Sequence, residues 1–149
     1  TDTQRRTATA LCDVIIPADS KSPAASTVGV PDFIDEWISA PYPGHDKDRA
    51  LVLDGLKWID AEAQKRFGND FADLVAGQQR AICDDICYLP KAKPEHQFAA
   101  QFFDTIRDQT ATAFYTTPQG WKDLGYIGNV AMPTFNGPNA EIRRKIGLE

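Results

Sequence analysis

"PYPGHDKDRALVLDGLKWIDAEAQKRFGND", residues 41–70, is the stretch that decides the fold. Its apolar residues recur at separations of four, three, four and four positions: Val52, Leu56, Ile59, Ala63 and Phe67. This spacing puts them on one face of an α-helix. Gly68 follows directly, and glycine is the residue type that most often ends a helix in a left-handed turn. The stretch therefore predicts a long amphipathic helix that ends at Phe67.

The same helical period recurs on both sides of this stretch, and strand signals are almost absent. Further helices are predicted over residues 3–15, 30–40, about 77–88 and about 94–115. In the last of these, the residues expected to face inward are Phe98, Phe102, Phe103, Ile106, Ala113 and Phe114. The prediction is an all-α fold with one domain over residues 1–149. It is a bundle of about five helices followed by a long irregular C-terminal arm.

The arm begins with many aromatic residues among helix breakers. Thr117 and Pro118 suit a short new turn of helix, since threonine caps and proline is tolerated just after the cap. A last helical turn is expected at residues 139–146. Tyr115, Trp121 and Tyr126 lie close together in this region. Two alternatives follow: either these rings close the protein's own core, or they form a face for another protein.

Length and charge exclude several classes of function. A chain of 149 residues with a net charge of −5 is a poor match for a phosphate backbone, so nucleic acid is not an expected partner. No run of 18 or more apolar residues exists, so no membrane span is predicted. No signal peptide is recognisable, because Arg5 and Arg6 are not followed by the apolar region of a twin-arginine leader.

Catalytic and cofactor motifs are not found. The sequence contains neither of the glycine-rich phosphate loops, no haem-attachment motif and no nucleophile elbow. His45 and His96 lie in different segments, each near the start of a helix, and are interpreted as solvated residues. No catalytic residue is therefore assigned, and this chain is expected to bind no cofactor or metal of its own.

The three cysteines leave three interpretations open. Cys83 and Cys87 in "CDDIC" share a helix face and could contribute two thiolates to a metal site. A disulfide between Cys12 and one of them would close a loop of about 70 residues and contribute roughly 4 kcal/mol. Burial of small apolar thiols is the third interpretation.

Three segments resemble the gluconate 2-dehydrogenase subunit 3 family. They are "CDVIIPADSKSPAASTVGVPDFIDEWI" at residues 12–38, "GLKWIDAEAQKRFGNDFADL" at 55–74, and "FFDTIRDQTATAFYTTPQGWKDLGYIGN" at 102–129. The first matches the family's I-P-x-D loop and V-x-x-F-I-D helix, and the last its T-x-P-x-G-W turn and L-G-Y-x-G closing. Each motif is short, but their order and separations are specific. The segment at residues 83–96, with its cysteine pair, departs from the pattern.

The resemblance implies a small, non-catalytic accessory subunit. Family members accompany a large FAD-containing dehydrogenase of the glucose–methanol–choline (GMC) type, often with a cytochrome c subunit whose haem accepts the electrons. The complex oxidises sugars or sugar acids in the periplasm and is membrane-associated. The small subunit usually carries a twin-arginine leader and supports folding, export and stability of the flavoprotein.

With this resemblance, the arm is interpreted as the contact with the flavoprotein. The expected interface residues are Tyr115, Trp121, Tyr126, Ile127 and Phe135. Closure of the chain's own core by the same rings remains the alternative. Two other functions also stay open: an independent metal protein or enzyme that uses Cys83 and Cys87, and a free-standing helical scaffold or chaperone.

Overall fold

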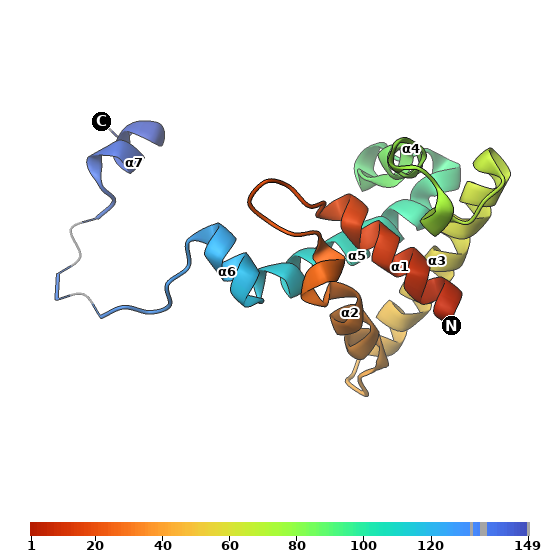
Figure 1. Ribbon diagram of the computed structural model, residues 1–149, viewed down its shortest axis with the longest axis horizontal. Helices are drawn as coiled ribbons and strands as arrows, with labels where there is room; N and C mark the ends of the chain where they lie inside the picture. Colours follow the sequence, from red (N-terminus) through yellow and green to blue (C-terminus); the bar gives the residue numbers. More distant parts are fainter. Residues whose placement is uncertain (132, 135–136, 149) are drawn as a thin grey trace.

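The computed structural model describes residues 1–131, 133–134 and 137–148. Within them the fold is all-α, as predicted, and contains no strand (Figure 1). The bundle helices are α1 (Asp2–Ile15), α2 (Val30–Ser39), α3 (His45–Phe67), α4 (Ala76–Ile86) and α5 (Gln97–Tyr115). Short 3₁₀ turns lie at Ala25–Val28, Phe71–Asp73, Leu89–Lys91 and Pro94–His96. Two short helices follow, α6 (Pro118–Leu124) and α7 (Ala140–Lys145).

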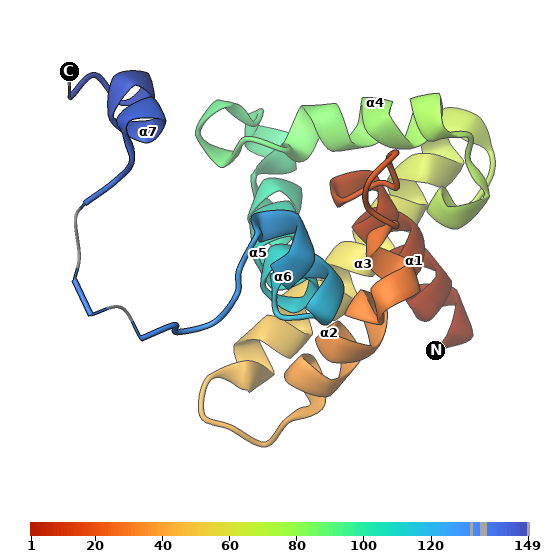
Figure 2. The same cartoon turned by 60° about the vertical axis from the view of Figure 1, so that its left-hand side comes forward.

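The arm leaves the body of the molecule after α6. In Figure 1 and Figure 2, α6 lies against the end of α5, and α7 stands apart from the five packed helices. The described residues between α6 and α7 are exposed and form no regular structure. The prediction of five bundled helices and an irregular C-terminal arm is therefore confirmed.

Helix ends follow the local chemistry that the sequence shows. Thr1 caps α1, because its hydroxyl accepts a hydrogen bond from the Gln4 backbone N–H at 3.3 Å while the Gln4 side chain bonds back. Gly68 follows α3 with φ of 76°, the left-handed turn expected of it. α4 ends at Ile86, two residues before the predicted boundary.

The helices α3 and α5 meet at the centre of the bundle. Gly55 on α3 faces the ring of Phe102 on α5, and a Cβ added at Gly55 would lie 2.1 Å from ring atoms. The two backbones can approach this closely only because position 55 has no side chain. Phe102 itself is completely buried.

The predicted inward face of α5 is correct except at its first turn. Phe102, Phe103, Ile106, Ala113 and Phe114 are all buried. The prediction for Phe98 is wrong, since 43% of its surface is exposed. At this turn the buried stripe passes through Ala99, one position further and about 100° around the helix axis. The spacing of four between Phe98 and Phe102 had indicated Phe98, but its neighbour Ala99 is the buried residue of this turn.

We expect Gly55→Ala to lower the free energy of unfolding by about 1–2 kcal/mol. Alanine gains up to about 1 kcal/mol of helix propensity over glycine, but overpacking a core costs about 1–3 kcal/mol and here the added carbon overlaps a buried ring. Urea unfolding followed by circular dichroism measures the difference.

Gly77→Ala is the matched control for this measurement. Gly77 lies in the first turn of α4, and no heavy atom lies within 4 Å of the Cβ that it would gain. This variant should be as stable as the original chain or up to about 1 kcal/mol more stable. Equal stability of Gly55→Ala and the unsubstituted chain would contradict the packing argument.

Candidate functional site

The short helix α6 is fixed firmly to the end of α5. The Thr117 hydroxyl accepts a hydrogen bond from the Gly120 backbone N–H at 3.1 Å and donates one to the Phe114 carbonyl at 2.7 Å. At the other end, Gly125 adopts φ of 65°, and the Tyr126 N–H donates to the Trp121 carbonyl at 2.8 Å. Both ends of α6 are therefore capped as the threonine and the glycine predict.

Gly120 lets α6 lie directly on the backbone of α5. A Cβ at this position would come within 2.3 Å of the Phe114 carbonyl oxygen and 2.6 Å of the Tyr115 Cα. Backbone atoms cannot move aside as the end of a flexible side chain can, so only glycine fits. A further contact comes from the loop after α1, where the Ser22 hydroxyl donates to Asp123 at 2.6 Å.

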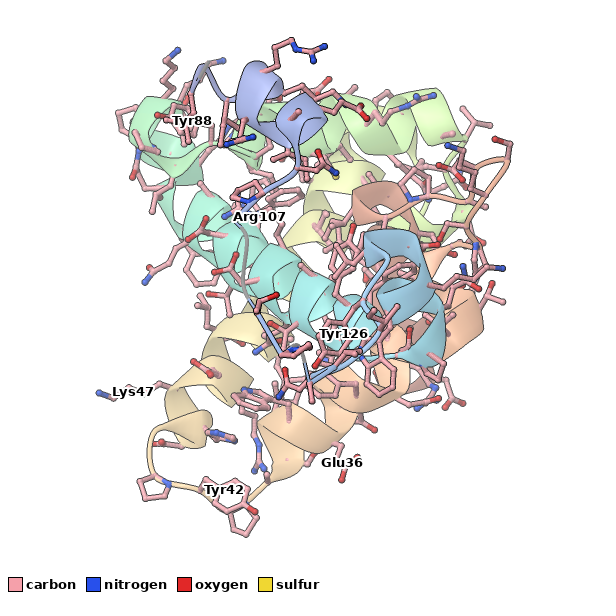
Figure 3. All side chains as sticks on the ribbon, turned by 90° about the vertical axis from the view of Figure 1, so that its left-hand side faces the viewer. Glu36, Tyr42, Lys47, Tyr88, Arg107 and Tyr126 are labelled. Carbon is pink, nitrogen blue, oxygen red and sulfur yellow. The ribbon has the colours of Figure 1, made fainter. Side chains whose placement is uncertain are left out.

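This anchorage leaves a group of large apolar side chains in solvent. We define the α6 face as Tyr115, Trp121, Leu124, Tyr126 and Ile127, all of which are exposed. Trp121 keeps 45% of its surface exposed, and its ring packs against that of Tyr126 with centroids 6.2 Å apart. Figure 3 shows Tyr126 beside α6 on the surface of the molecule. Exposed apolar side chains gathered in one region are typical of interaction sites, although single exposed ones are common on any protein.

Four of the five residues predicted as interface are exposed in the structure, and the interface role itself stays a prediction. They are Tyr115, Trp121, Tyr126 and Ile127, whereas Phe135 lies outside the described residues. Leu124 was not predicted, although its place three residues after Trp121 on a short helix could have indicated it.

A second aromatic group, only partly exposed, was missed at the sequence level. Phe33 and Trp37 of α2 have ring centroids 5.9 Å apart, and the His45 ring stacks on Trp37 at 4.6 Å. Tyr42, in the loop between α2 and α3, meets His45 edge-on. The spacing of four between Phe33 and Trp37 was the available signal, since it places both rings on one side of α2.

Both histidines are only partly exposed and not simply solvated. His45 Nδ1 donates to the Trp37 carbonyl at 2.9 Å, which joins the start of α3 to the end of α2. His96 lies edge-on to Trp58 with ring centroids 5.8 Å apart.

Two half-buried acids join neighbouring helices. Asp60 accepts hydrogen bonds from the Thr7 hydroxyl and the Phe71 backbone N–H, which joins α1, α3 and a 3₁₀ turn. Burial raises the pKa of the Asp60 carboxyl, although these hydrogen bonds act in the opposite direction. Asp85 on α4 pairs with Arg66 of α3 at 2.7 Å, and this hydrogen bond lowers the pKa of Asp85.

All three cysteines are free thiols in the structure, Cys12 and Cys83 buried and Cys87 exposed. Burial raises the pKa of the Cys12 thiol to about 11 and that of Cys83 to about 12. The thiolate is the form that binds metals, and this environment suppresses it. In the part of the chain that the structure describes, no group of three or more His, Cys, Asp or Glu side chains is arranged to hold a metal ion.

Thiol labelling at pH 8 should therefore modify Cys87 rapidly and leave Cys12 and Cys83 unmodified. Both are shielded from reagent, and their raised pKa keeps them protonated. Reaction with a chromogenic disulfide reagent, before and after addition of guanidinium chloride, measures the accessible and total thiols. The expected total for the denatured chain is three.

The variant Cys87→Ser is the control for this assignment and should have no rapidly reacting thiol. For the unsubstituted chain, a total of one thiol in guanidinium chloride would instead show that two of its three cysteines are joined, as in the disulfide interpretation.

A protein-family model matches most of the chain. The model of the family gluconate 2-dehydrogenase subunit 3 matches residues 2–133. This match includes all of α1 to α6, and so includes the α6 face. Neither the curated proteins nor the solved structures gave a match to the chain. The match covers well over half of the sequence and confirms the resemblance seen in its motifs: the chain belongs to the gluconate 2-dehydrogenase subunit 3 family.

Proposed function

We propose that this chain is the small subunit of an FAD-dependent sugar or sugar-acid dehydrogenase complex and binds the large flavoprotein subunit through the α6 face. Membership of the family makes it an accessory subunit of a dehydrogenase complex. The GMC-type flavoprotein holds the FAD and oxidises the substrate. A cytochrome c subunit accepts the electrons through its haem. The small subunit supports folding, export and stability of the flavoprotein.

The observation that carries this proposal is the exposed α6 face on a rigidly held helix. Tryptophan and tyrosine are the residue types that most often dominate the binding energy of protein interfaces. They bring a large contact area with little loss of rotamer freedom. Trp121 and Tyr126 are already in ring contact. Their positions are fixed by the capped ends of α6, so little further ordering is needed on binding.

The proposed complex works in the periplasm and associates with the membrane through its other subunits. None of the helices described in this chain is long and apolar enough to cross a bilayer. Attachment would then come from the proposed cytochrome subunit.

The proposal is tested by purification of the tagged chain from native periplasmic and membrane extracts. We expect a yellow complex in which mass spectrometry identifies a GMC-type dehydrogenase in one-to-one ratio, with an FAD absorbance spectrum. Haem absorbance in the same complex would reveal the cytochrome subunit. Isolation of a colourless chain without flavoprotein would contradict the proposal.

We expect Trp121→Ala to weaken binding to the flavoprotein by about 30-fold, since loss of an interface anchor costs about 2 kcal/mol or more. The melting temperature of the isolated chain should change little, because the ring is already half exposed. Binding is measured with co-expressed flavoprotein by surface plasmon resonance. Tyr88→Ala provides a matched control, as Tyr88 is an equally exposed ring remote from α6 (Figure 3). A large fall in melting temperature for Trp121→Ala would favour the alternative in which Trp121 closes the core.

A further inference from the structure

The short helix α7, at the end of the C-terminal arm, is closed by a complete local motif. The Gly147 N–H donates to the Arg144 carbonyl at 3.3 Å. The Leu148 N–H donates to the Arg143 carbonyl at 2.9 Å. Gly147 adopts φ of 74°, and two such hydrogen bonds around a left-handed glycine form a Schellman motif.

The C-terminal end of α6 carries the same motif. The Gly125 N–H donates to the Lys122 carbonyl at 3.1 Å. The Tyr126 N–H donates to the Trp121 carbonyl at 2.8 Å. In both helices one apolar residue comes directly before the glycine and another directly after it: Leu124 and Tyr126 in α6, Ile146 and Leu148 in α7. α7 therefore presents apolar side chains in the same way as part of the α6 face.

The apolar side chains of α7 are exposed. Ile142 keeps 46% of its surface exposed, Ile146 59% and Leu148 67%. Ile142 and Ile146 are four positions apart, so they lie on one side of the helix. Figure 1 and Figure 2 show α7 away from the five packed helices, so the core of this chain does not cover that side.

The length of α7 makes its helical structure depend on a contact. It has six residues, and isolated helices shorter than about 12–15 residues are marginal in water. Local interactions favour the helix, since the Asn139 side chain accepts from the Ile142 N–H at 2.9 Å and Lys145 pairs with Glu141 at 2.9 Å. They do not replace a buried face. A surface that buries the apolar side of α7 would supply the missing stabilisation.

The position of α7 in the chain indicates which surface this is. The arm leaves the body at Ile127, which belongs to the α6 face, and residues 128–139 lead to α7. A connection of this length spans at most about 45 Å. α7 therefore remains within reach of a protein that is bound to the α6 face. Its last turn is basic, with Arg143, Arg144 and Lys145, which suits an acidic surface.

We propose that α7 is a second anchor on the flavoprotein, where it docks in a shallow apolar groove with acidic residues at its edge. The inference rests on the function proposed above. A helix that lays residues four positions apart into a groove is a common mode of recognition. Because the α6 face holds the two chains together, docking of α7 is intramolecular, and even a weak contact raises the overall affinity.

This contact goes beyond what family membership implies. The family model ends at residue 133, whereas α7 begins at Ala140. The α6 face lies inside the matched part and α7 outside it. The two anchors can therefore be tested separately on the same partner.

Surface plasmon resonance tests the proposal, with the full chain and the FAD-containing dehydrogenase that purifies with it. The double variant Ile142→Ala and Ile146→Ala should bind about tenfold more weakly, because it loses two apolar anchors. Dissociation should become faster while association stays nearly the same, since the α6 face is unchanged. Alanine is the best helix former, so a lower helix propensity cannot explain the loss. The melting temperature of the isolated chain should not change.

Two further variants and one measurement distinguish docking of α7 from general surface effects. Val75→Ala shortens an aliphatic side chain that is also exposed, before α4 and on the other side of the molecule in Figure 1, and should leave both rates unchanged. Gly147→Ala should weaken binding about tenfold, because a side chain strains the left-handed turn although no heavy atom lies within 4 Å of it. Hydrogen exchange of the α7 amides should be slower in the complex than in the free chain.

The outcomes separate this inference from the proposed function. Binding of the double variant with the affinity of the unsubstituted chain would overturn the second anchor and leave the α6 face as proposed. Failure of the unsubstituted chain to bind any flavoprotein would overturn both. Self-association that the double variant abolishes would assign α7 to a second copy of this chain. Binding to vesicles of anionic phospholipid, lost in the same variant, would assign it to a bilayer surface; either result, with unchanged flavoprotein affinity, contradicts the proposal.

Discussion

The close approach of α3 and α5 at Gly55 is the constraint on which the packing of the five bundled helices depends. With the Phe102 ring in the space that a side chain at position 55 would fill, α5 runs through the centre of the bundle. The last turn of α5 in turn supplies the base on which α6 lies. The proposed interface with the flavoprotein is thus built on a helix that is buried along much of its length.

Polar side chains inside this fold are largely committed to joining helices. Arg66 bonds Glu62 of its own helix and Asp85 of α4, and Asp60 binds Thr7 of α1. Such partly buried groups need partners to offset the loss of water. His96 Nδ1 and Gln109 Oε1 differ from them, because these buried atoms have no hydrogen-bond partner among the described residues.

The sequence predicted what depends on near neighbours in the chain. The helix up to Phe67, its end at Gly68 and the cap at Thr117 all follow from residues within a few positions of one another. Phe98 was assigned wrongly because periodicity cannot tell which of two adjacent residues the rest of the fold will cover. Most of the α6 face could be proposed from sequence because its residues fall within a short stretch, from Tyr115 to Ile127.

Contacts between helices could not be predicted in the same way. Trp37 and His45 come from two helices, and each has an ordinary interpretation until the packed structure stacks their rings. The missing hydrogen bond to Gln109 Oε1 is likewise a property of the packed structure and has no counterpart in the sequence. Equally, the need for glycine at positions 55 and 120 becomes visible only when the neighbouring helix is in place.

The capping of α6 at both ends has a kinetic consequence for assembly. Because the Thr117 cap, the Gly120 contact and the Ser22–Asp123 hydrogen bond already fix the helix, no folding step has to precede docking on this face. Association can then proceed at the rate set by diffusion and orientation, about 10⁵–10⁷ M⁻¹s⁻¹ for ordinary protein pairs. Differences in affinity among related partners would reside in how long the complex lasts and much less in how fast it forms.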